Sequence, residues 1–133
     1  MSGVAAIRYT LANAAAVIAQ VPAARIFAGT VPLNAALPAI GVAQVSGVER
    51  LTVSMGESSR FRTDRVQVTV YAATYATKVS ILDLVRTALS PVRGTVGSVD
   101  VDSILPDSEG PDIDDEEARV YERSRDFMVS WRT

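Results

Sequence analysis

Apolar residues recur along the chain at two periods, one typical of helices and one typical of strands. Within residues 4–20 they return every three or four positions, which predicts one amphipathic helix with Ser2 as its N-cap and Pro22 just beyond its end. A second stripe of this kind predicts a helix that Thr74 caps and Pro91 follows. Its apolar positions are Ile81, Leu82, Val85, Ala88 and Leu89.

Alternation of apolar and polar residues predicts strands elsewhere. The clearest strand is residues 60–72, where Val66, Val68 and Val70 share one side and the residues between them share the other. We expect further strands at residues 25–27, 39–45, 50–55, 95–105 and 118–131, with a turn at Ser46 and Gly47.

The order of these elements is helix, strands, helix, strands. The connections between neighbouring strands are of hairpin length, so we expect the strands to pair antiparallel. The pattern therefore predicts an α+β fold, with a mainly antiparallel sheet and two helices packed on one face. It contains no internal repeat and no linker, so residues 1–133 are expected to form a single domain.

Composition narrows the chemistry that such a domain can carry out. The chain has 133 residues, of which 48% are apolar, and this is enough for a hydrophobic core. It contains no cysteine and no histidine, which removes disulfides, zinc-thiolate sites, thiol nucleophiles and Ser-His-Asp triads. We therefore expect a binding or structural module that is not an enzyme and uses no cofactor or metal.

Charge and hydropathy limit the surroundings of the protein. The formal net charge is −2, whereas a protein that binds phosphate backbones usually carries a basic excess. No apolar run approaches the length of a membrane span, and no basic segment precedes the alanine-rich start of the chain. We expect neither a membrane segment nor a signal peptide, so the protein is expected to stay in the compartment where it is made.

Residues 107–117, the acidic segment, are predicted to form a loop between two strands. A divalent-cation site is one interpretation, because Asp112, Asp114 and Glu116 alternate, but the EF-hand order is absent and Gly110 precedes the cluster. Composition favours a solvated loop, and a contact surface for a partner is the third interpretation. The carboxylates of the acidic segment are Asp107, Glu109, Asp112, Asp114, Asp115, Glu116 and Glu117.

Other titratable residues give weaker indications of chemistry. Asp100 and Asp102 share one side of a predicted strand, yet nothing in the pattern singles out a buried acid of the kind that glycosidases need. Lys78 falls near the apolar stripe of the second helix, in its first turn. We expect its long side chain to reach water rather than to act as a base. No glycine-rich phosphate loop is present in the sequence.

Four arginines flank a polar turn expected at residues 56–59 and form a basic cluster: Arg50, Arg60, Arg62 and Arg65. Apart from Phe61, the interleaved aromatic residues that nucleic-acid surfaces favour are absent from it. An interface between subunits is the more natural use of the basic cluster, since it would meet the acidic segment of a neighbouring copy. Such a head-to-tail contact closes into a ring if the rotation permits.

Three stretches of the chain resemble one protein family in their order and spacing. They are RVQVTVYA at residues 65–72, YATKVSILDLVRTAL at residues 75–89 and YERSRDFMVSW at residues 121–131. Together with the first helix, Arg25–Ile26 and Leu37–Pro38, they resemble the tail-completion, or tail-terminator, proteins of tailed bacteriophages and related prophage and gene-transfer particles. The resemblance spans nearly the whole chain and rests on packing patterns.

The resemblance implies a small α+β domain that assembles as a hexameric ring at the head-proximal end of the tail. Such a ring ends polymerisation of the tail tube protein and presents the docking surface for the head-tail connector protein. DNA passes through its lumen without sequence-specific binding. The resemblance further implies no catalysis, no cofactor and no membrane, and a location in the virion after assembly in the bacterial host cytoplasm.

The role of the acidic segment stays open. In the lumen its carboxylates would repel DNA phosphates, whereas facing the head they would meet a basic connector surface in a salt-sensitive contact. Two other functions stay open as alternatives. One is a head-tail connector or stopper protein of the same neck region, and the other is a carboxylate-rich divalent-cation-binding module. The acidic segment and the basic cluster supply the candidate interface residues.

Overall fold

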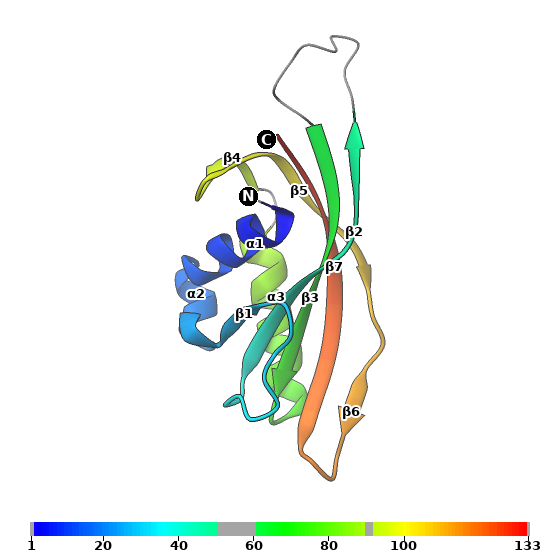
Figure 1. Ribbon diagram of the computed structural model, residues 1–133. Coiled ribbons are helices and arrows are strands. Elements are labelled where there is room, and N and C mark those ends of the chain that lie inside the picture. The colour runs from blue at the N-terminus through cyan, green and yellow to red at the C-terminus, as the bar shows by residue number, and fades with distance from the viewer. Residues whose placement is uncertain (1, 51–60, 90–91, 133) are drawn as a thin grey trace.

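The computed structural model of the chain describes residues 2–50, 61–89 and 92–132 (Figure 1). Its helices are α1 (Gly3–Ala12), α2 (Ala15–Ile18), the 3₁₀ turn η1 (Ala23–Arg25) and α3 (Tyr75–Leu89). Its strands are β1 (Ile26–Ala28), β2 (Ala39–Arg50), β3 (Phe61–Ala72), β4 (Val92–Val96), β5 (Val99–Glu109), β6 (Ile113–Asp115) and β7 (Val120–Arg132).

The strands form one seven-stranded, curled sheet in which β7 is a central strand. The order is β1-β2-β3-β7-β5-β4, and β6 pairs with the start of β7. β1 and β2 pair in parallel, and the other pairings of the described strands are antiparallel. The predicted α+β class and mainly antiparallel sheet are therefore confirmed, with three α-helices where two were expected.

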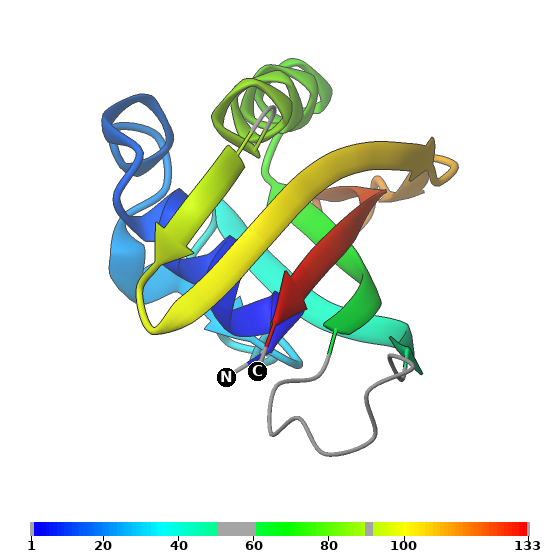
Figure 2. The same ribbon diagram turned by 90° about the horizontal axis from the view of Figure 1, so that it is seen from above.

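The hydrophobic core lies between the sheet and helices α1 and α3. Alternate residues of β3 face it, so Val66, Val68 and Val70 are fully buried, as their spacing predicts. Both helices pack against β3 and β7 and contact each other (Figure 2). The buried side chains on these helices recur at three- and four-residue spacings, and they include Ile7, Leu11, Ile81, Leu82, Val85 and Leu89.

The first predicted helix is divided in two. Helix α1 begins as expected, because the Ser2 hydroxyl accepts a hydrogen bond of 3.0 Å from the first turn. It ends where Asn13 directs both its backbone and its side-chain nitrogen to the Tyr9 carbonyl. An asparagine competes for backbone carbonyls in this way, so the expectation of one helix over residues 4–20 was wrong. None of the described helices is long and apolar enough to cross a membrane.

The turn expected at Ser46 and Gly47 is also wrong, because β2 continues through both residues. A bulge after Gln44 leaves one extra residue on β2 relative to β3. A Cβ at Gly47 would lie 2.7 Å from Asp64 Oδ1, so this glycine marks a close approach within a strand. The strand expected next, at residues 50–55, lies mainly outside the described residues.

The strand expected at residues 95–105 is part of a hairpin. β4 and β5 pair antiparallel outward from Val96 and Val99, and Gly97 lies in the turn with a φ of +60°. Glycine adopts this left-handed conformation without the steric cost of a Cβ. A Cβ at Gly97 would also lie 3.2 Å from the Tyr9 ring. Gly97 therefore allows the chain to turn from β4 into β5 close to α1.

The acidic segment differs from the loop that its composition predicts. It is exposed over most of its length, but its first residues extend β5 and Ile113–Asp115 form β6. Between these strands the Gly110 amide donates to the Ser124 carbonyl at 2.8 Å. The acidic segment therefore follows β7, and only residues 116–119 form the turn that leads into it.

Candidate functional site

A buried carboxylate joins three elements at the end of the sheet that holds the chain ends. Asp64 of β3 is 1% exposed, and its Oδ2 accepts the Gly3 amide at 3.0 Å and the Trp131 indole Nε1 at 2.7 Å. Because Gly3 opens α1, the carboxylate also lies at the positive end of that helix. Asp64 was not among the residues that the sequence pattern pointed to. It could have been found from its position two residues before Val66, on the side of β3 that carries the buried valines.

The structure places one arginine of the basic cluster, Arg62, beside Asp64. Arg62 lies 3.5 Å from Asp64 Oδ1, and its guanidinium is 5.9 Å from the centroid of the Trp131 ring. Arg50 is exposed at the end of β2. Arg60 falls outside the described residues. Arg62 therefore contacts residues of its own chain, whereas the charge of Arg50 is on the surface.

The first carboxylates of the acidic segment pair with arginines of their own chain. Arg65 of β3 pairs with Asp107 and, at 3.2 Å, with Asp126 of β7. Arg125 donates to Glu109 at 2.8 Å. These pairs link the end of β5 to the rest of the sheet. As partly exposed pairs, they contribute at most about 1 kcal/mol each. Part of the contact expected between basic cluster and acidic segment is therefore made within one chain.

The lysine expected to reach water is buried beneath the acidic segment. Lys78 is 0% exposed, and its Nζ donates to Asp112 Oδ1 and Asp114 Oδ1, both at 2.8 Å. Its ammonium lies 4.1 Å from the centroid of the Tyr75 ring. The expectation was wrong because β6 and the residues before it fold over the first turn of α3 and supply carboxylates in place of water.

Asp112 is the centre of this charge network. It also accepts the Arg123 Nε at 2.7 Å and the Tyr75 hydroxyl at 3.0 Å. The hydrogen bond from Lys78, helped by those from Arg123 and Tyr75, lowers the pKa of Asp112 from 3.8 to about 2. Burial disfavours the charge on Lys78, but its hydrogen bonds to Asp112 and Asp114 outweigh burial and raise its pKa. Lys78 and Asp112 thus stay charged at neutral pH, so their contact is suited to structure and not to proton transfer.

The described acidic residues do not gather into a metal site. The oxygens of Asp112 and Asp114 that the cation interpretation requires bind the Lys78 ammonium. Across the three described ranges, no group of three or more potential ligands is placed to hold a metal ion. Asp115 closes the turn after β6 by accepting the Ala118 amide at 3.1 Å.

Three carboxylates remain on the surface at the end of β6 and in the turn that follows it. We call Asp115, Glu116 and Glu117 the acidic tip. All three are exposed, and none forms an ion pair with another described residue. Figure 1 shows the β6–β7 turn at the end of the molecule opposite the chain ends. The acidic tip is therefore the part of the acidic segment that offers free charge to a partner.

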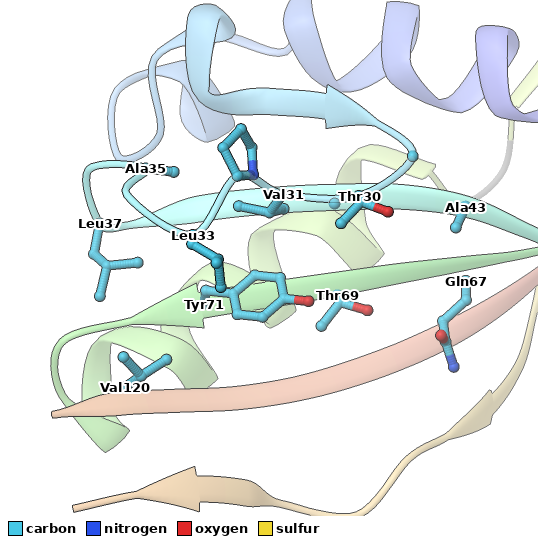
Figure 3. Close-up of a pocket in the computed structure, with 13 residues that line it drawn as sticks. Thr30, Val31, Leu33, Ala35, Leu37, Ala43, Gln67, Thr69, Tyr71 and Val120 are labelled. Carbon is cyan, nitrogen blue, oxygen red and sulfur yellow. The ribbon is translucent and has the colours of Figure 1, made fainter. Parts of the chain in front are cut away.

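A groove lies on the side of β3 that faces away from the core. The segment between β1 and β2 folds over β2 and β3, and the groove beneath it has a volume of about 630 Å³ (Figure 3). Leu37 and Tyr71 line the groove, Thr69 and Gln67 contribute polar atoms, and none of the described residues that line it is charged. Leu33 stands fully exposed at its rim. The groove suits an apolar side chain better than it suits catalysis by a titratable group.

Comparisons with known proteins agree with the resemblance noted in the sequence. The family described as "Tail completion protein gp17" matches residues 5–130. A chain in the solved structure "Virion of native gene transfer agent (GTA) particle" shares the fold, with a TM-score of 0.68 and 16% sequence identity. That match covers 99% of this chain and 96% of the other. A comparison with curated proteins found no match. Because the family match spans nearly the whole sequence, this chain belongs to the tail completion protein gp17 family, whose members are phage tail structural proteins.

Proposed function

We propose that this chain is the subunit of a hexameric ring that caps the tail tube at its head-proximal end. The ring ends polymerisation of the tube, presents the docking surface for the head-tail connector protein, and lets DNA pass through its lumen. The family match over residues 5–130 carries this proposal. The likeness in fold to a chain from a gene transfer agent virion is consistent with a place in such a particle.

The distribution of charge supports a role based on contacts between proteins. The charged residues around Lys78 satisfy one another within the chain, whereas the acidic tip is unpaired within the described residues and projects from one end of the molecule. A ring of identical copies would repeat the acidic tip around one face. We propose that this face docks a basic surface of the connector in a contact that salt weakens.

Deletion of the gene in a host that produces particles tests the function. We expect tail tubes of unregulated length that carry no heads, as seen by negative-stain electron microscopy, and a plasmid copy of the gene should restore normal particles. Tails of normal length without heads would instead indicate a connector or stopper. Particles of normal appearance would overturn both functions.

The mass of the native assembly tests the ring. We expect a six-fold mass by native mass spectrometry and a six-fold ring in averaged images of purified tails. A monomer in solution together with tails that lack a six-fold ring would contradict the proposal.

A further inference from the structure

Two edges of the sheet are open in the described part of the chain. The outer edge of β2 pairs only with β1, at residues 40–42, which leaves residues 43–50 without a described neighbour on that side. On the opposite side of the sheet, β4 is the last strand and pairs only with β5. The unpaired backbone groups of an edge strand form hydrogen bonds readily with another strand.

The open part of β2 has little protection against such pairing. All of residues 43–50 are exposed, and Val45 and Val48 are 54% and 58% exposed. This stretch contains no lysine and no proline, the residues that commonly block edge strands. Its bulge lies at the start, so the regular portion that follows is available to a partner strand.

The geometry of the sheet favours a second copy of the chain as the partner. Four antiparallel pairings separate β2 from β4, so the two strands run in the same direction. Figure 1 shows both edges in the half of the molecule that holds the chain ends, and Figure 2 shows them on opposite sides. Rotating copies about an axis along the strands brings β2 of one copy beside β4 of the next, in parallel.

The charges at the two edges are complementary. Arg50 lies on the face of β2 that carries Val48, which is turned away from the core. Asp100 lies opposite Thr95 on the corresponding face of the β4–β5 hairpin, and it is exposed. Neither Arg50 nor Asp100 forms an ion pair with another described residue. On this face, Arg50 at one edge and Asp100, one strand in from the other edge, can therefore satisfy each other.

We infer that β2 of one copy pairs with β4 of the next, so that a single sheet continues around the ring. Arg50 then approaches Asp100 of the neighbouring copy across β4. The inference rests on the proposed ring and names the surface that closes it. In a closed ring every copy uses both of these edges once, so neither of them is left to recruit further chains.

Cross-linking tests the pairing directly, because the chain contains no cysteine. The double variant Val48→Cys/Thr95→Cys places one thiol on the same face of each edge, and a short bismaleimide tolerates small differences in register. The experiment uses the purified full chain and, in parallel, purified tails. We expect a ladder of covalent multimers up to six from the double variant and no ladder from either single variant.

Each other result overturns part of the inference. Efficient dimers from Val48→Cys alone would mean that β2 pairs with β2, which excludes β4 as the partner. Rings that form without giving a ladder would exclude the edge contact and leave the proposed ring standing. Absence of both ladder and ring, in solution and on tails, would exclude both.

Charge reversal gives an independent measurement of the same contact. We expect Arg50→Glu and Asp100→Arg each to raise the concentration of half-assembly roughly tenfold, because each places like charges together. The two changes combined should restore it to within about twofold of the unmodified chain. Glu116→Arg at the acidic tip is the matched control, since it alters net charge as Asp100→Arg does but lies away from both edges. Sedimentation velocity measures all four, and failure of the double variant to recover would exclude the Arg50–Asp100 contact.

Discussion

Asp64 and Lys78 are the two charged residues that are buried in the described part of the chain, and their hydrogen-bond partners are distant in sequence. A buried charge is tolerated only with partners that replace water. Asp64 Oδ2 accepts hydrogen bonds from α1 and β7, and Asp64 Oδ1 has no hydrogen bond but lies 3.5 Å from the Arg62 guanidinium. Lys78 donates to carboxylates of the acidic segment. Each of these two charged side chains therefore holds separate elements together, and both have a structural role.

Removing the buried ammonium should loosen the acidic segment. Lys78→Met keeps much of the apolar stem but removes the cation that Asp112 and Asp114 share, and only Asp112 keeps another, Arg123. We expect a loss of about 1–3 kcal/mol in the free energy of unfolding, measured by urea denaturation. Arg86→Met, which removes an exposed cation from the same helix, is the control and should change stability by at most about 0.5 kcal/mol. Equal losses in the two variants would contradict the role given to Lys78.

The low pKa of Asp112 makes a specific prediction about acid stability. Its folded-state pKa of about 2 lies below the ordinary value of 3.8, so ionised Asp112 stabilises the fold above about pH 4. This contribution is lost as the pH falls toward 2. The difference in melting temperature between the unmodified chain and Asp112→Asn should therefore be constant near neutral pH and shrink between about pH 4 and pH 2. A difference that does not depend on pH over this range would contradict the prediction.

The Asp64 carboxylate can be followed through the single tryptophan of the chain. Asp64→Ala leaves the Trp131 indole and the Gly3 amide without an acceptor. We expect a loss of roughly 2–4 kcal/mol in the free energy of unfolding, because hydrogen bonds to a charged group are stronger than neutral ones. A red shift of Trp131 fluorescence should accompany it, since water then reaches the indole. Asp83→Ala, at an exposed position of α3, should produce neither change.

Among the helices and strands, the sequence predicted those features that depend on local patterns. Ser2 and Thr74 cap helices as expected, and the spacing of the β3 valines identified the core face. Gly47 was misread, because a glycine that makes a turn and one that makes room for Asp64 look alike in a sequence. Only the pairing of β2 with β3 distinguishes the two.

The candidate site was predictable only in part, because its contacts join distant residues. The acidic segment was identified by composition, yet its pairing with Lys78 spans 34 and 36 residues and depends on β6 lying against α3. Likewise, composition suggested Arg65 and Asp107 as candidate interface residues but did not show that they meet in one chain. Charge patterns identify residues that need partners, and topology decides which partners they obtain.

The close approach at Gly47 predicts a steric effect on β2. In Gly47→Ala the new Cβ would lie 2.7 Å from Asp64 Oδ1 and 2.8 Å from an Arg62 nitrogen. We expect a destabilisation of about 1–3 kcal/mol by thermal or urea unfolding, as is typical of overpacking. Ser46→Ala, at the neighbouring exposed position, should be nearly neutral. Equal stability of Gly47→Ala and the unmodified chain would show that β2 can move aside at this point.

Across the whole molecule, the acidic tip is expected to contribute to docking and not to the stability of the fold. The triple variant Asp115→Asn/Glu116→Gln/Glu117→Gln should fold with a stability within about 0.5 kcal/mol of the unmodified chain, because these side chains are exposed and form no ion pair with a described residue. The asparagine keeps an oxygen that can accept the Ala118 amide. We expect tails that carry it to join heads less efficiently and to lose the salt dependence of joining, measured by mixing purified tails and heads. Unchanged joining with altered DNA release would instead place the acidic tip in the lumen.

The central position of β7 has a consequence for how the protein is synthesised. β7 joins β1-β2-β3 on one side to β4-β5 on the other, and among the described strands no other pairing connects these two parts of the sheet. Translation produces β7 after both parts, so each waits on the ribosome with an unpaired edge. The sheet is therefore completed only when β7 emerges. A chain cut short before β7 would leave both parts with an open edge, which pairs readily with strands of other chains.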